Sequence, residues 1–151
     1  MTPHFSLHEL TFTQHRGLEN TPSPLIAARL ENILAPGLEK VREILGGHPI
    51  HVNSGFRSAA VNIAVGGTGN SAHCLGFAAD IVCPGFGSPL EVCRALEAAM
   101  AARELRLDQL IFEYGEWTHV SFDPRFRGEV LTKLAGRPYR NGLPQAGKEP
   151  T

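Results

Sequence analysis

The sequence lacks a long apolar run, and no stretch approaches the roughly 20 residues that a membrane-spanning helix needs. Its first residues, MTPHFSLHEL, have no basic start followed by an apolar core, which a Sec signal peptide requires. We therefore expect synthesis in the cytoplasm without a Sec signal and no insertion into a membrane. If the protein acts on an extracytoplasmic target, another process must release it.

An excess of charge of one sign is also missing. The 14 Lys and Arg residues are balanced by 15 Asp and Glu residues, for a formal net charge of −1. Proteins that bind nucleic acid without sequence preference depend on surplus positive charge. The composition therefore predicts no nucleic-acid partner.

Cysteine is scarce, with three residues in 151 and no C-x-x-C spacing. A disulfide scaffold is thereby disfavoured, and a chain of this length buries a core without one. We expect a single domain over residues 1–135 that is monomeric, because nothing in the sequence demands a dimer. Residues 136–151 are polar and rich in Gly and Pro, which predicts a poorly packed C-terminal tail.

The spacing of apolar residues predicts a series of helices, several with a Ser N-cap. One short helix follows Ser6, and another covers one or two turns within residues 58–65. Between them, a long helix begins at Pro24 and is expected to break or kink at Pro36-Gly37. A capping box at Ser88 opens a further helix that ends near residue 103.

Four segments have the β-branched content or alternation of strands. They are residues 49–53, 77–83, 108–114 and 117–122, the last two forming a hairpin. Because the strands lie too close together for repeated βαβ crossovers, we expect an α+β fold. Its sheet should be small and mainly antiparallel, with flanking helices.

The segment H-x-x-G-x-A-x-D, from His73 to Asp80, is the most informative part of the sequence. Glu116 and His119 add an E-x-x-H further along. Two imidazoles and one carboxylate are the ligands of a catalytic zinc ion that keeps its fourth position for water. Cys74 offers a fourth ligand for a closed structural site, but we favour a packing role for it. We interpret the other histidines as surface or capping residues: His4, His8, His15, His48 and His51.

An ordered series of motifs resembles the zinc D-Ala-D-Ala carboxypeptidase family, which includes phage endolysins. These peptidases share a wider group with lysostaphin-type peptidases and the hedgehog signalling domain. The resemblance covers roughly residues 5–135, and residues 17–22 are similar to the phage-type branch. Its motifs are S-G-F-R-S at 54–58, Asn62, V-G-G at 65–67, S-x-H-x-x-G-x-A-x-D at 71–80 and W-x-H-V-S at 117–121.

The resemblance implies that Zn²⁺ is held by His73, Asp80 and His119. It also implies that Arg57 binds substrate and stabilises charge on the scissile carbonyl, for which a permanently charged guanidinium is suited. Ser71 would line the same pocket. Trp117 would either stack on substrate or pack over the metal site.

The resemblance further implies a carboxylate base three residues before the last histidine ligand, which is Glu116. Glu113 is the alternative, because it lies on the preceding strand, on the same face as Ile111. A tight turn at residues 115–116 would let either carboxylate reach the site. We favour Glu116 on motif spacing and interpret Glu113 otherwise as a partner of a ligand or of Arg57.

The resemblance predicts a zinc-dependent peptidase that cuts the peptide part of peptidoglycan. The bond that it cuts would be D-Ala-D-Ala or L-Ala-D-Glu. The protein would be a phage or prophage enzyme that acts on the cell wall after release. The alternative is a zinc-containing wall-binding or phage structural module without catalysis, because fold does not imply turnover. Arg57 together with a nearby carboxylate favours the enzyme, since a binding module needs no such pair.

Overall fold

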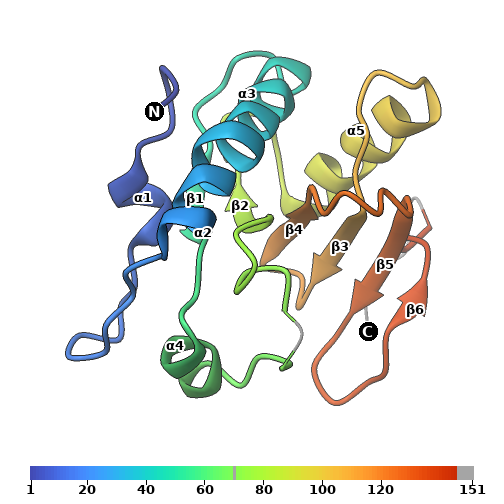
Figure 1. Cartoon of the computed structure of the whole chain (residues 1–151). Coiled ribbons are helices and arrows are strands. Elements are labelled where there is room, and N and C mark those ends of the chain that lie inside the picture. The colour runs from blue at the N-terminus through green and yellow to red at the C-terminus, as the bar shows by residue number, and fades with distance from the viewer. Residues whose placement is uncertain (70, 146–151) are drawn as a thin grey trace.

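Six strands form one sheet in the order β1-β2-β4-β3-β5-β6 (Figure 1). The computed structural model describes residues 1–69 and 71–145. All neighbouring strands are antiparallel except β3 and β5, which are parallel. The expected α+β fold with a mainly antiparallel sheet is confirmed. The strands are β1 (His51–Ser54), β2 (Ala78–Val82), β3 (Gln109–Glu113), β4 (Trp117–Ser121), β5 (Glu129–Lys133) and β6 (Arg140–Asn141).

Helices cover one face of this sheet. The helix α5 packs on β3 and β4 and also contacts α3 (Figure 1). Strand residues that point toward these helices form the buried core, whereas alternate residues point to the opposite face. No helix within the described residues is long and apolar enough to span a bilayer. The helices are α1 (Leu7–Thr11), α2 (Pro24–Arg29), α3 (Ala35–Ile44), α4 (Ala59–Ala64) and α5 (Pro89–Ala101).

The long helix is not broken at Pro36-Gly37, contrary to expectation. A π-helical turn, Leu30–Leu34, joins α2 directly to α3, and the Ala35 N–H donates to the Leu30 carbonyl. This wider turn lets Pro36 enter in the first turn of α3, where its missing N–H costs little. Gly37 is required by packing, because a Cβ there would lie 2.5 Å from the Phe122 ring.

The C-terminal part adds two strands, β5 and β6, that the sequence pattern did not reveal. The Gly142 N–H donates to the Val130 carbonyl at 2.7 Å, and Leu143 packs against the core. Arg94 Nη2 donates to the Pro144 carbonyl at 3.1 Å. Residues 142–144 are half-buried, contrary to the expectation of poor packing, whereas Arg140 and Asn141 are exposed. Residues 146–151 lie outside the described residues. We propose that the domain extends to residue 144, beyond the expected boundary at 135.

A buried ion pair joins the start of β3 to the segment before β5. Asp108 is 1% exposed and accepts hydrogen bonds from Arg127 Nε, Nη2 and backbone N–H, each at 2.9 Å. The hydrogen bonds from Arg127 lower the pKa of the Asp108 carboxyl, against the opposing effect of burial. The folded state therefore favours the charged carboxylate.

We expect Asp108→Asn to lower the free energy of unfolding at pH 7 by about 1–3 kcal/mol. A carboxyl with a lowered folded pKa stabilises the protein above its unfolded value of about 3.9 and loses this effect as the pH falls further. The difference between parent and variant should therefore shrink below about pH 4. Urea unfolding at pH 7 and pH 3 measures it.

Glu43→Gln is the matched control, because the Glu43 side chain is 74% exposed. It should leave stability unchanged at both pH values. Equal stability of Asp108→Asn and the parent at pH 7 would show that this ion pair contributes nothing net.

Candidate metal centre

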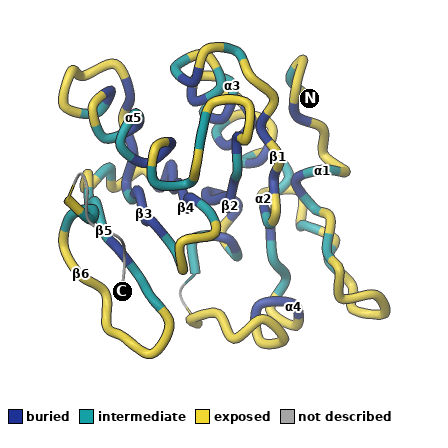
Figure 2. Tube along the Cα trace, turned by 180° about the vertical axis from the view of Figure 1, so that it is seen from behind, coloured by how far each residue is buried: buried dark blue, intermediate teal, exposed yellow. Residues whose placement is uncertain are grey.

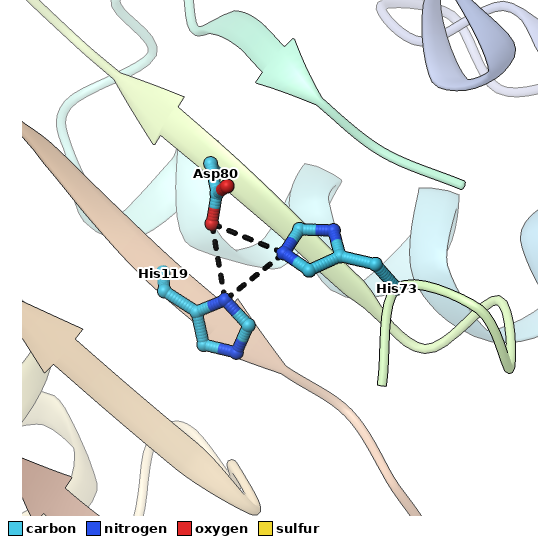
Figure 3. A group of neighbouring side chains, drawn as sticks. All are labelled: His73, Asp80 and His119. Atoms are coloured by element: carbon cyan, nitrogen blue, oxygen red, sulfur yellow. Dashed lines mark hydrogen bonds and ion pairs between the residues drawn. The ribbon is translucent and has the colours of Figure 1, made fainter. Parts of the chain in front are cut away.

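Three side chains converge on the face of the sheet opposite α3 and α5. Asp80 on β2 lies directly across from His119 on β4, so both side chains point to the same face. His73 comes from the loop that precedes β2, and the three point toward one another (Figure 3). His73 Nε2, His119 Nδ1 and Asp80 Oδ1 form a triangle with sides of 3.2, 3.0 and 3.2 Å. All three residues are buried.

The hydrogen bonds determine which His73 nitrogen faces this triangle. His73 Nδ1 donates to the Gly55 carbonyl at 2.8 Å, because a carbonyl oxygen can only accept. In the neutral ring Nε2 then carries a lone pair, which is aimed at the Asp80 carboxylate and at His119 Nδ1. Atoms this close to one another need a positive charge between them, either a proton on one of the imidazoles or a metal ion.

The spacing of these atoms fits a zinc ion. Bonds of about 2.0–2.1 Å at tetrahedral angles separate donor atoms by roughly 3.3–3.4 Å, close to the observed sides. A search of the described residues for three or more His, Cys, Asp or Glu side chains close enough to share a metal ion finds this cluster. Three protein ligands leave the fourth position of a tetrahedral ion free, as in catalytic zinc sites.

Arg57 lies beside this cluster, held by three side chains. Its Nη2 donates to Asp80 Oδ2 at 3.1 Å, its Nε to Ser54 Oγ at 3.0 Å and its Nη1 to Asn62 Oδ1 at 3.4 Å. Asn62 Nδ2 in turn donates to the Thr68 carbonyl at 2.7 Å. The glycine-rich segment after α4 is thereby tied to Arg57.

The electrostatics of Asp80 follow from these neighbours. Burial acts to raise the pKa of the Asp80 carboxyl, but His73 and His119 overcome that effect and hold the pKa well below its usual range. Asp80 is therefore a carboxylate at neutral pH. An ionised carboxylate is the form that binds a metal ion.

Asn20 fixes the loop that carries Arg57, a role that the sequence pattern did not suggest. Its Nδ2 donates to the carbonyls of Thr11 and Phe56, and its Oδ1 accepts from the Ser58 N–H at 2.7 Å. One side chain thus ties the end of α1 to the residues on both sides of Arg57. This contact gives a physical reason for an asparagine within residues 17–22.

The two candidate base residues occupy different environments. Glu113 lies on the same sheet face as His119, with Oε1 3.5 Å from His119 Nδ1 and a side chain 15% exposed. Burial raises the pKa of Glu113. Glu116 is exposed in the three-residue turn between β3 and β4, although it lines the same cleft. Of the two, Glu113 lies against the cluster, through its contact with His119.

The remaining predicted residues also lie near the site. Ser71 and Trp117 line an open cleft of about 1270 Å³ that contains the cluster. Ser71 Oγ accepts from the His73 N–H at 3.2 Å, and Trp117 packs edge-to-face on Tyr114 with ring centroids 5.3 Å apart. Cys74 lies outside the converging cluster.

The sheet, the three-residue cluster and the open cleft define a protein with a candidate mononuclear metal centre. Residues 3–121 match the family model described as Peptidase M15. The chain therefore belongs to the peptidase M15 family. A 44-residue segment, 29% of the chain, is 50% identical to part of the zinc D-Ala-D-Ala carboxypeptidase of Streptomyces albus G. That match covers 17% of the length of the Streptomyces protein.

We expect His73→Ala and His119→Ala each to abolish stoichiometric zinc binding while the domain stays folded, because the helix-covered core is on the other face. Metal content after dialysis, with circular dichroism for folding, measures this. His51→Ala is the control, since His51 is exposed on β1. Undiminished zinc content in either cluster variant would exclude that histidine as a ligand.

Proposed function

We propose that this chain is a zinc-dependent peptidase that hydrolyses peptide bonds in the stem peptides of peptidoglycan. The convergence of His73, Asp80 and His119 within an open cleft is the observation that carries this proposal. The family membership supports peptidase chemistry. The zinc and the D-Ala-D-Ala substrate in the name of the Streptomyces relative support the metal and the substrate class.

The residues around the cluster have the chemistry that amide hydrolysis needs. Zinc held by His73, Asp80 and His119 would supply a Lewis acid and a water of lowered pKa. Arg57 donates to Asp80 and lines the cleft, so its guanidinium suits a substrate carbonyl or carboxylate there. Its anchoring by Ser54 and Asn62 orients it before substrate arrives.

We further propose that Glu113 is the general base, in place of Glu116, which motif spacing favoured. A base must lie within reach of the proton that it accepts, and Glu113 is adjacent to His119. Its raised pKa suits a group that takes a proton from the attacking water and gives it to the leaving amine. The exposed turn position of Glu116 offers no such environment.

Within this class we propose two activities, a D-Ala-D-Ala carboxypeptidase or an L-Ala-D-Glu endopeptidase, with the cell wall as the place of action. The Streptomyces relative supports the first by its name. The resemblance of residues 17–22 to the phage-type branch supports an endolysin role.

We expect Glu113→Gln to lower kcat about 100-fold or more while zinc content stays the same, because the amide cannot accept the proton. Glu116→Gln is the matched control from the same hairpin and should keep activity close to that of the parent. Steady-state hydrolysis of stem peptides, with metal analysis of each variant, gives the comparison. The reverse pattern would assign the base to Glu116.

Mass spectrometry of purified peptidoglycan, digested with and without a chelator and zinc add-back, tests the function as a whole. A zinc-dependent new peptide end is expected, and its mass identifies the bond. Zinc-loaded, folded protein that yields no product would support the alternative of a non-catalytic wall-binding module.

A further inference from the structure

The cleft continues past the candidate metal centre to the β5–β6 hairpin. Tyr139, which directly precedes β6, lines the same cleft as His73, Asp80 and His119. The hairpin lies at the sheet edge, in the orange and red part of the chain (Figure 1). The tube drawn in Figure 2 shows the loop between these strands as exposed. Tyr139 itself is 52% exposed. The hairpin is outside residues 3–121, which match the family model.

Strand register places Tyr139 in line with the site. Trp117 pairs with Glu113 across β4 and β3, and Glu113 pairs with Lys133 across β3 and β5. Arg140 pairs with Thr132 on β5, so Tyr139 lies beside Lys133. Lys133 Nζ is 5.7 Å from the centroid of the Tyr139 ring. One row across four strands therefore connects the site to Tyr139.

Spacing along this row gives the reach of the cleft. Neighbouring strands lie about 4.8 Å apart, so Tyr139 is roughly 10 Å from Glu113. An extended peptide advances about 3.3–3.6 Å per residue. His119 lies on β4, one strand further from β6 than Glu113, so the candidate centre is about 14 Å from Tyr139. A substrate with its cleaved bond at the metal centre would therefore contact Tyr139 with a unit about four residues away.

The hairpin backbone that carries Tyr139 is anchored by side chains of β5. The Lys133 ammonium donates to the carbonyls of Leu134 and Arg137, which closes the turn of the hairpin. Thr132 Oγ1 donates to the Gly142 carbonyl at 2.8 Å and fixes the end of β6. Burial raises the pKa of Tyr139, with smaller effects of the same sign from Glu113, Tyr114 and Asp80.

We propose that Tyr139 forms a distal subsite for the stem peptide, so that the cleft prefers substrates extending about four residues beyond the cleaved bond. The ring is half-exposed, is carried by an anchored hairpin and lines the same cleft as the candidate centre, as a contact surface for a peptide chain requires. This inference rests on the proposed function. It assigns part of the substrate specificity to a segment beyond residues 3–121, which match the family model.

The test compares a long and a short substrate in four proteins. The long substrate is the stem pentapeptide, and the short ones are the N-acetylated dipeptides D-Ala-D-Ala and L-Ala-D-Glu. The proteins are the zinc-loaded parent, Tyr139→Ala, Tyr139→Phe and the control Phe86→Ala. Phe86 is 37% exposed in the loop before α5 and does not line the cleft.

We expect Tyr139→Ala to lower kcat/KM for the pentapeptide roughly three- to tenfold, mainly through KM, and to leave dipeptide hydrolysis unchanged. Tyr139→Phe keeps the ring and should resemble the parent, as should Phe86→Ala. Equal losses on long and short substrates would overturn the proposal, since Tyr139 would then support the centre itself. Unchanged hydrolysis of both would overturn it as well.

Binding distinguishes failure of this inference from failure of the proposed function. Trp117 is the single tryptophan of the chain and lies in the cleft, so its fluorescence reports pentapeptide binding directly. If the parent binds the pentapeptide without cutting it, the proposed function fails, and a weaker Kd for Tyr139→Ala still supports the subsite. The same Kd in both proteins, or no binding to the parent, would overturn the subsite.

Discussion

The antiparallel pairing of β2 with β4 places Asp80 directly opposite His119, and the candidate centre depends on that register. Side chains alternate along a strand, so a slip of one residue would turn either group into the core. The flanking residues prevent such a slip, because Ala79, Ile81 and Val120 are buried among the helix-side core. His73 completes the triangle because its ring is oriented by the Gly55 carbonyl. The same packing that stabilises the sheet therefore sets the positions of the candidate ligands.

The two faces of the sheet carry different tasks. One face buries apolar side chains against α3 and α5 and supplies the stability of the fold. The other holds a buried carboxylate, two imidazoles and a guanidinium, an arrangement that is costly unless each charge is paired. Asp80 meets Arg57 and both histidines, and Arg57 is itself held by Ser54 and Asn62. A bound cation would complete this balance.

Local patterns in the sequence predicted much of this arrangement. Residues 77–83 were predicted as a strand, whose alternation separates Asp80 from Ala79 and Ile81. The resemblance carried by the ordered motifs implied the grouping of His73, Asp80 and His119. The environments of the two glutamates depended on the conformation of the turn between β3 and β4. Tyr114 and Gly115 have positive φ there, and Glu113 pairs with Trp117. Glu116 therefore lies in the exposed turn. The strands β5 and β6 form by pairing at the sheet edge, and β6 has two residues, too few for a periodic pattern. The continuous helix through Pro36 depends on a π turn, for which the sequence pattern offered no signal.

The central claim is that His73, Asp80 and His119 together hold one zinc ion. Anomalous diffraction at the zinc edge, from crystals of the zinc-loaded protein, tests it most directly. The account predicts one strong peak within bonding distance of His73 Nε2, His119 Nδ1 and Asp80 Oδ1. A zinc peak at other residues, or none in crystals of a folded, zinc-saturated protein, would contradict it.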